Sequence, residues 1–260
     1  MATPVLETRD LSIRFGGHLA VDRVSATFQA GTLTAIVGPN GAGKTTYFNL
    51  ISGQLPASAG RVLLAGKDIT SLKAPARARL GLGRAFQLTN LFPRLSVHEN
   101  VRLAVQAKAG GGGNIASRWS ARGDWIDKAD RYLAATDLKD KRDVMAVALP
   151  HGDKRKLEVA IMMALEPHVF MFDEPTAGMS VGDVPVILDL IKTLKADASK
   201  TILLVEHKMD VVRSLADRII VLHNGKLVAD GDPATVIASP VVQEAYLGAT
   251  VETPAAGRPA

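Results

Sequence analysis

Residues 38–45 of this 260-residue chain read Gly-Pro-Asn-Gly-Ala-Gly-Lys-Thr, which matches the pattern G-x-x-x-x-G-K-T. The continuous apolar run Leu33–Val37 comes before this stretch, and the helical pattern Thr45–Ser52 comes after it. In a strand, loop and helix of this kind, successive backbone N–H groups and the positive end of the helix face one anion. This context disfavours the alternative, a glycine-rich turn with an incidental lysine. The stretch therefore predicts a phosphate-binding loop.

Two side chains of this loop carry chemistry of their own. Lys44 is expected to reach the β- and γ-phosphates of a bound nucleotide, and the Thr45 hydroxyl is expected to ligate Mg²⁺. The loop therefore predicts that the chain binds ATP together with a magnesium ion.

A second apolar run, Val169–Phe172, ends in two carboxylates, Asp173 and Glu174. Ligands of open α/β sheets collect at the carboxyl ends of the strands, so Asp173 is expected near the magnesium held by Thr45. The neighbouring Glu174 would reach a water behind the γ-phosphate and accept its proton, which makes it the candidate general base. An ordinary strand end with exposed acids is the alternative, which the upstream loop disfavours.

A third apolar run, Ile202–Val205, repeats this design and is followed by Glu206 and His207. His207 is expected to donate a hydrogen bond to the γ-phosphate, so that the site senses whether that phosphate is present. A structural histidine at a strand end is the alternative. The shared edge with the other two strands favours the functional interpretation.

The pattern around these runs predicts an α/β fold. A fourth apolar run, Ile219–Leu222, and the helical patterns Lys156–Leu165 and Val184–Ala196 alternate with the others, which is typical of a parallel sheet covered on both faces. The shorter strands expected in Leu6–Thr27 and Arg61–Leu64 predict an attached antiparallel piece.

The stretch Leu88–Leu149 has a different texture, rich in Ala, Leu, Arg and Asp, and predicts an inserted helical lobe. Helices are expected at Val97–Ala107 and Asp124–Thr136, and the four glycines of residues 110–113 are expected to form a flexible loop. The end of the chain, Thr253–Ala260, is rich in proline and small residues and is expected to be frayed.

Composition excludes several classes of protein. With 47% apolar residues the chain can bury a core, and with no cysteine it can form neither disulfides nor cysteine-ligated zinc. No apolar stretch reaches the roughly 18 residues of a membrane span, so a soluble chain that remains in the cytosol is expected. The net charge is +5, but Lys and Arg are scattered beside acids, which predicts a solvated surface rather than a nucleic-acid site.

Taken in order, these pieces resemble the nucleotide-binding subunits of ABC transporters, from Leu6 to Gly248. The order itself is the specific feature: an aromatic residue, the phosphate loop, a glutamine, a helical insert, a signature segment, the paired acids and the histidine. The resemblance implies a P-loop NTPase (RecA-like) core, 5–87 and 155–250, with an antiparallel β-subdomain. It also implies a helical subdomain, 88–154, within a single domain spanning 5–250, and a flexible tail, 251–260.

The resemblance also implies roles for individual residues. Phe15 would stack on adenine, Gln87 would contact Mg²⁺ and the attacking water, and His207 would be the switch histidine. The residues implied to contact nucleotide are Phe15, Val21, Asn40, Gly41, Ala42, Gly43, Lys44, Thr45, Thr46 and, from the opposite subunit, Gly152. The implied catalytic residues are Lys44, Gln87, Glu174 and His207, and the implied magnesium ligands are Thr45, Gln87 and Asp173.

Residues 149–153, Leu-Pro-His-Gly-Asp, occupy the place of the family signature Leu-Ser-Gly-Gly-Gln and depart from it. Pro150 replaces a serine that would help to hold the γ-phosphate of the opposite subunit's ATP, and His151 replaces a glycine. Gly152 and the following helix terminus remain as N–H donors. Asp153, in place of the glutamine, puts a negative charge near where nucleotide should sit, unless it caps the helix or pairs with Lys154 or Arg155.

Further stretches are similar to the ATPase subunits of branched-chain amino-acid (LIV-type) importers and of relatives that import urea or amides. They are Phe15-Gly16-Gly17 with Ala20-Val21, Arg84-Ala85-Phe86-Gln87 with Leu91-Phe92, Ala177-Gly178-Met179, and Ala245-Tyr246-Leu247-Gly248. This resemblance implies a second ATPase subunit, identical or different, separate transmembrane permease subunits at the inner face of the cell membrane, and a solute-binding protein. The competing interpretations are a soluble ABC ATPase of translation or DNA repair, and a nucleotide-gated binding module with little hydrolysis.

Overall fold

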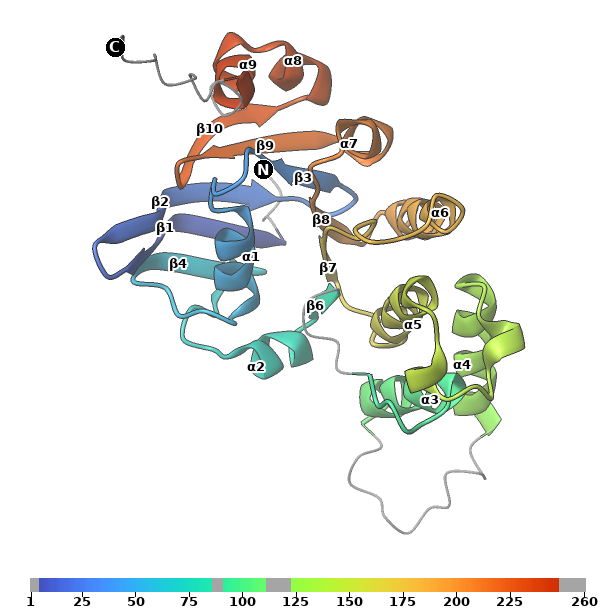
Figure 1. Cartoon of the computed structure of the whole chain (residues 1–260). Coiled ribbons are helices and arrows are strands. Elements are labelled where there is room, and N and C mark those ends of the chain that lie inside the picture. The colour runs from blue at the N-terminus through green and yellow to red at the C-terminus, as the bar shows by residue number, and fades with distance from the viewer. Residues whose placement is uncertain (1–4, 86–90, 111–122, 248–260) are drawn as a thin grey trace, which may run out of the picture.

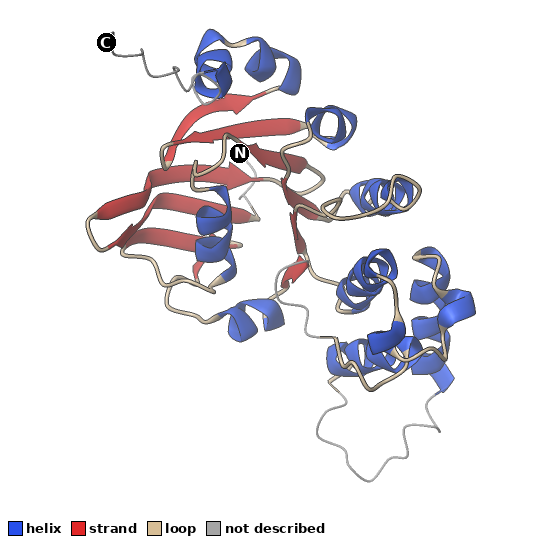
Figure 2. Cartoon of the chain, viewed as in Figure 1, coloured by secondary structure: helices blue, strands red, loops and turns tan. Residues whose placement is uncertain are grey.

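The computed structural model describes residues 5–85, 91–110 and 123–247 (Figures 1 and 2). Two sheets meet at an angle, with helices on the outer face of the larger sheet and a helical lobe beyond one end of it. Three sequence predictions lie outside the described residues: the placement of Gln87, the loop of residues 111–113 and the tail of residues 251–260.

The larger sheet has the strand order β10-β9-β3-β8-β7-β6. All neighbouring strands pair in parallel except β10, which runs antiparallel to β9. This confirms the parallel sheet expected from the four apolar runs. The strands are β3 (Leu33–Val37), β6 (Leu82–Ala85), β7 (Val169–Asp173), β8 (Thr201–Val205), β9 (Arg218–His223) and β10 (Lys226–Gly231).

The smaller sheet is antiparallel, in the order β2-β1-β4-β5, as the opening segment of the sequence predicted. Its strands are β1 (Leu6–Phe15), β2 (His18–Phe28), β4 (Ala59–Leu64) and β5 (Lys67–Asp68). Helix α1 (Lys44–Ser52) packs between the two sheets in one hydrophobic cluster. The Tyr47 hydroxyl lies 2.7 Å from the Thr8 hydroxyl, which satisfies both buried groups.

Alternate residues of the central strands enter different cores. Met171 of β7 and Leu203 of β8 face the cluster around α1, whereas Phe170 and Leu204 face the opposite side. Helices α5 (His151–Ala164), α6 (Val184–Lys195) and α7 (Met209–Leu215) cover that opposite side (Figure 1). Burial on both faces explains why these strands are continuously apolar.

The helical lobe contains α3 (Val97–Lys108), α4 (Gly123–Ala135), the short helices η3 (Lys139–Lys141) and η4 (Ala146–Ala148), and one face of α5. Leu157 and Ala160 of α5 pack in this lobe, whereas Val159 and Met162 pack against the sheet. Helix α5 is therefore shared by two cores. The remaining helices are α2 (Ala74–Arg79), α8 (Pro233–Ala238) and α9 (Pro240–Leu247).

Candidate active site

Three loops converge at the carboxyl edge of the larger sheet. The phosphate loop follows β3, Asp173 ends β7 with Glu174 directly after it, and Glu206 and His207 follow β8. These three strands are neighbours in the order β3-β8-β7, and parallel strands expose the same end at the same edge. The backbone N–H of Glu174 donates to the carbonyl of Val205 at 2.9 Å, which joins two of the loops directly.

The phosphate loop has the backbone that its glycines allow. Gly43, immediately before α1, has a φ of 95°, and a Cβ there would lie 2.5 Å from the carbonyl oxygen of Ala20. Only glycine fits a left-handed conformation with so close a backbone neighbour. Gly41 also has a positive φ, 77°, with nothing within 4 Å of its Cβ position. The loop is therefore a turn with open space on one side.

Lys44 begins α1 and folds back over the loop. Its Nζ donates to the carbonyl oxygens of Gly38 at 2.7 Å and Pro39 at 2.9 Å. Burial lowers the pKa of the Lys44 ammonium, while the charges of Glu174 and Asp173 raise it. The lysine and both acids, far apart in sequence, therefore lie within electrostatic reach of one another.

Asp173 is nearly buried and is held by Arg84 of β6. Arg84 Nη2 donates to Asp173 Oδ2 at 2.7 Å, and the two side chains are 6% and 3% exposed. Burial raises the pKa of the Asp173 carboxyl, and the Arg84 charge opposes that rise. Asp173 has no further hydrogen bond within the described part of the chain, so its Oδ1 is available to another ligand.

Glu174 and His207 form the more accessible half of the site. Glu174 takes a left-handed φ of 49°, which turns the chain directly after β7. His207 Nδ1 lies 3.6 Å from Glu174 Oε1, and the two side chains are 53% and 41% exposed. The candidate base and the candidate sensor are therefore neighbours that both face open space.

Glu206 fixes the local backbone and has no role in the sequence predictions. Its carboxylate is 1% exposed and accepts hydrogen bonds from the Thr176 hydroxyl at 2.7 Å and the His207 N–H at 2.8 Å. A charge buried this deeply needs such partners. Thr176 lies just beyond Glu174, so Glu206 ties the loop after β7 to the loop after β8.

The other predicted nucleotide contacts differ in accessibility. Phe15, at the end of β1, is 48% exposed and can offer a ring face. Val21 is fully buried, and its side chain packs beneath Gly43. In this conformation Val21 supports the loop and does not line its surface. Asn40 is exposed in the loop, and Thr45 and Thr46 lie in the first turn of α1.

The signature segment lies at the start of α5. The helix begins at His151, five residues before the predicted helical pattern, with Pro150 as its N-cap residue and Gly152 in its first turn. Asp153 is 5% exposed and makes its ion pairs with Lys141 and, at 3.8 Å, with Lys156. These partners differ from Lys154 and Arg155, which the sequence offered as one way to neutralise this charge.

Asp153 could not be placed from sequence, because one of its partners belongs to another element. Lys141 comes from η3, and Lys156 lies one turn further along α5. The negative charge that replaces the family's glutamine is therefore neutralised from within the helical lobe. Within the described residues, the hydrogen bond that the Asp153 carboxylate accepts comes from Lys141 and not from a backbone N–H at the start of α5.

The oxygen donors at this edge fit a magnesium nucleotide. Mg²⁺ prefers carboxylate, hydroxyl and phosphate oxygens and is commonly held by one or two carboxylates plus substrate phosphates. Asp173 and Thr45 provide such donors beside the phosphate loop. In the described ranges no group of three or more His, Asp or Glu side chains could hold a metal without the substrate.

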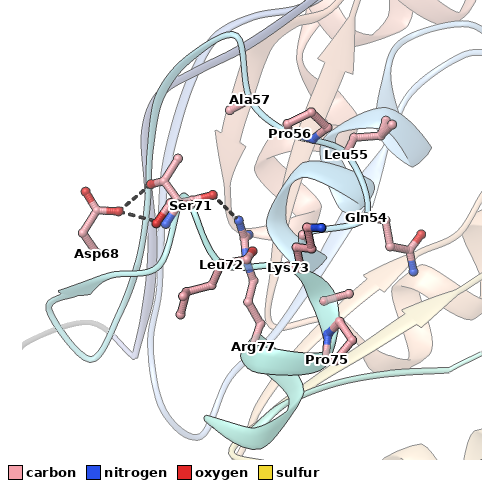
Figure 3. A pocket seen from close by; sticks show the side chains of 13 residues that line it. Gln54, Leu55, Pro56, Ala57, Asp68, Ser71, Leu72, Lys73, Pro75 and Arg77 are labelled. Carbon is pink, nitrogen blue, oxygen red and sulfur yellow. Dashed lines mark hydrogen bonds between the residues drawn. The ribbon is translucent and has the colours of Figure 1, made fainter.

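One cavity lies away from this edge. It has a volume of about 780 Å³ and lies between the end of α1 and the start of α2 (Figure 3). Arg77 points into this region and donates to the carbonyls of Thr70, Leu50 and Ile51. None of the predicted nucleotide contacts lines it. It is lined by Gly53, Gln54, Leu55, Pro56, Ala57, Asp68, Thr70, Ser71, Leu72, Lys73, Ala74, Pro75 and Arg77.

This fold and this edge define the ATPases of ABC transporters, and the chain belongs to that family. The family model described as ABC transporter matches residues 21–177. A second model, described as branched-chain amino acid ATP-binding cassette transporter, matches residues 226–252. The phosphate loop, the paired acids and the family match together make the chain an ATP-binding cassette ATPase.

Individual relatives cover nearly the whole chain. The high-affinity branched-chain amino acid transport ATP-binding protein LivG of Escherichia coli K12 is 36% identical over 95% of this chain and 99% of its own length. The high-affinity branched-chain amino acid transport ATP-binding protein BraF of Pseudomonas aeruginosa is 35% identical over 95% of this chain and 99% of its own length. The lipopolysaccharide export system protein LptB of E. coli K12 is 32% identical over 95% of the chain and 98% of its own length.

A solved structure agrees with the fold. The ADP conformation of MJ1267, an ATP-binding cassette of an ABC transporter, has a TM-score of 0.79 and 29% identity, covering 95% of this chain and 100% of its own. Within the residues that the structure describes, no helix is both long and apolar enough to cross a membrane.

Proposed function

We propose that the chain is the ATP-hydrolysing subunit of an importer that takes up branched-chain or other amino acids, or a related small solute such as urea or an amide. The convergence of Lys44, Asp173, Glu174 and His207 at one sheet edge carries the proposal for hydrolysis. The names of LivG and BraF and the match over residues 226–252 support the substrate class.

The chain's own residues suit each part of the reaction. The loop N–H groups of residues 39–43 and Lys44 bind the phosphates, and Phe15 stacks on adenine through its exposed ring. Thr45 and Asp173, together with Gln87, would hold Mg²⁺, which would neutralise phosphate charge and orient the triphosphate. In the nucleotide complex, Lys44 Nζ would donate its hydrogen bonds to phosphate oxygens instead of to the Gly38 and Pro39 carbonyls.

Glu174 is the proposed general base. It is 41% exposed at the end of a buried strand, beside His207 and opposite the phosphate loop, so a water can reach it. The carboxylate accepts a proton from that water as the water oxygen attacks the γ-phosphorus; the bond from the γ-phosphorus to the β,γ-bridging oxygen breaks, and ADP and inorganic phosphate are formed. His207 contacts the γ-phosphate and reports its presence to the loop that Glu206 connects to Thr176.

Two ATPase subunits are proposed to enclose each nucleotide, with Gly152 of one subunit facing the γ-phosphate bound by the other. The start of α5 supports this, since its first-turn N–H groups form an anion-binding end. The second subunit is an identical or a different ATPase chain. Removal of the γ-phosphate weakens the contacts that hold the two together.

The helical lobe is the proposed contact to the permease subunits at the inner face of the membrane. Phe92, Met145 and Val147 are 54%, 46% and 62% exposed. They lie in adjoining segments. Ser96 and Met145 form an isolated antiparallel β-bridge, and the Val147 N–H donates to the Pro93 carbonyl at 3.0 Å. Exposed apolar side chains gathered in this way mark protein contacts. A periplasmic solute-binding protein would select the solute.

The replacement Glu174→Gln tests the proposal for hydrolysis. Phosphate release should fall by about 100-fold or more, because the amide cannot accept the proton, while the affinity for ATP stays within about threefold. Retained hydrolysis in this variant would refute the assignment of the base. Lack of hydrolysis by the wild-type chain, alone and with its co-purified permease subunits, would favour a nucleotide-gated binding module.

A further inference from the structure

The carboxyl edge of the larger sheet carries acids that would repel a negatively charged ligand. Asp173 ends β7 and Glu174 follows it, so two acids stand at the edge where the highly negative triphosphate is proposed to bind. When Mg²⁺ accompanies the nucleotide, the metal offsets this repulsion. When the metal is absent, a cationic side chain at this edge can take over part of that role. Arg84 is such a cation and has no part in the reaction proposed above.

Arg84 is already paired with the metal-ligating acid. Its Nη2 donates to Asp173 Oδ2 at 2.7 Å, and both side chains are more than nine-tenths buried. A charge-assisted bond between two groups so far from water is strong. Lys44, by contrast, donates to two carbonyls of its own loop. Arg84 is therefore the cation in direct contact with Asp173.

Arg84 is also held in place from the far side. Its Nη1 donates to Asn49 Oδ1 at 2.6 Å and to Ser52 Oγ at 2.8 Å, and its guanidinium carbon lies 5.2 Å from the centre of the Phe48 ring. All three anchors are on α1, the helix that begins at the phosphate loop. The cation is therefore preformed at the site and does not have to be recruited when nucleotide arrives.

The Asp173 carboxylate is 3% exposed, and its neighbour in the chain, Glu174, is a second acid. Without Arg84, a buried carboxylate would face the phosphates without a partner, which is the costly half of a broken buried ion pair.

We propose that Arg84 is a built-in counter-cation for Asp173, which lets this edge accept and retain nucleotide while no Mg²⁺ is bound. The inference rests on the proposed nucleotide site and adds a residue to it. The arginine reduces the dependence of nucleotide affinity on the metal. A purely structural ion pair between β6 and β7 would instead affect affinity equally with and without metal.

The experiment measures the affinity of the full chain for a fluorescent ATP analogue at pH 8, in excess EDTA and in excess Mg²⁺. Arg84→Gln should weaken binding by about tenfold in EDTA, equivalent to about 1.4 kcal/mol. In Mg²⁺ the loss should stay below about threefold, because the metal supplies the missing charge. Arg61→Gln, which removes an exposed cation 3.9 Å from Asp68, should change neither value.

Two further variants separate charge from fold. Arg84→Lys keeps the charge and should recover most of the metal-free affinity, whereas the double variant Arg84→Gln with Asp173→Asn removes both charges and should recover it as well. Thermal unfolding checks each protein. If Arg84→Gln does not fold, Asn49→Ala, which removes one anchor and keeps the charge, should weaken EDTA binding alone by a smaller factor.

The outcomes distinguish failure of the role proposed for Arg84 from failure of the proposed nucleotide-binding function. Equal losses in EDTA and in Mg²⁺, no loss in either, or no recovery in the double variant would overturn the role of Arg84 and leave the nucleotide site standing. Failure of the wild-type chain to bind the analogue in both conditions would overturn the proposed function itself.

Discussion

Gly152 lies so close to Asp183 that a Cβ added to the glycine would stand 2.7 Å from Asp183 Oδ2. Asp183 is itself held, accepting a hydrogen bond from the Ser180 hydroxyl at 2.7 Å and pairing with Lys156 at 3.2 Å. The signature segment at the start of α5 is therefore fitted against the loop that precedes α6.

Gly152→Ala should lower the free energy of unfolding by about 1 kcal/mol. Crowding in a packed site costs about 1 to 3 kcal/mol, and the better helix propensity of alanine offsets up to about 1 kcal/mol of that. Urea unfolding measures the difference. In an Asp183→Ala background the obstacle is gone, so the same replacement should be neutral or stabilising. A loss of equal size in both backgrounds would contradict the contact.

Lys44→Ala should weaken nucleotide binding by about 100-fold, or about 2.7 kcal/mol, because charge-assisted bonds to the phosphates are lost. Titration with a fluorescent ATP analogue in Mg²⁺ provides the measurement. Lys67→Ala, which removes an exposed lysine on β5, is the matched control and should bind as the wild type does. Unchanged affinity in the Lys44 variant would rule out its role in the phosphate loop.

Arg77→Met should lower the free energy of unfolding by about 3 kcal/mol, because several buried carbonyls lose their donor at once. Arg77 is 2% exposed, and its guanidinium donates to Leu50 and Ile51 at 2.7 and 2.6 Å. Burial lowers its pKa to about 10, so it remains charged at neutral pH. Arg79→Met, an exposed neighbour on α2, should have little effect. A similar loss in both variants would argue against the carbonyl contacts.

The free energy of unfolding should fall as the pH rises above 10, because Tyr132 ionises more readily in the unfolded chain. Burial, with a hydrogen bond to Glu166 at 2.9 Å, raises the pKa of its phenol from 10.0 to about 12. Between these values the unfolded chain loses the proton that the folded chain keeps, so the unfolded state binds fewer protons and stability falls. The contribution is about 1 to 2 kcal/mol, since the ring is partly exposed.

Comparison of wild type and Tyr132→Phe isolates this effect. Urea unfolding at pH 9, 10 and 11.5 should give a shallower loss of stability in the variant, because the phenol is absent from both of its states. Equal slopes in the two proteins would contradict the raised pKa. Other groups that titrate in this range act equally in both proteins and cancel.

The sequence was sufficient for the parts of the fold that have a local pattern. The apolar runs became β3, β7, β8 and β9 because strands buried on both faces need continuous apolarity. Strand β6 was missed because its residues, Leu-Gly-Arg-Ala, form no apolar run. It is a strand because it pairs with β7 at the edge of the sheet, which is a property of the tertiary structure.

In the candidate site, too, the features with a local sequence pattern were predicted and those set by tertiary contacts were not. The phosphate loop and the paired acids follow buried strands, so sheet topology alone predicts their convergence. Arg84 was not found, since its partners Asp173 and Asn49 lie 89 and 35 residues away. The pairing of Asp153 with Lys141 was not predicted either, because an acid in the first turn of a helix can be reached by a side chain from an adjacent element.

The double packing of α5 limits how this protein can be recombined with its relatives. Leu157 and Ala160 belong to one core, and Val159 and Met162 belong to the other. A chimera that exchanges only residues 88–149 would leave the new lobe against a helix shaped for the old one. Grafting of a foreign lobe should therefore require matched replacements on α5, because one helix serves the packing of both the lobe and the larger sheet.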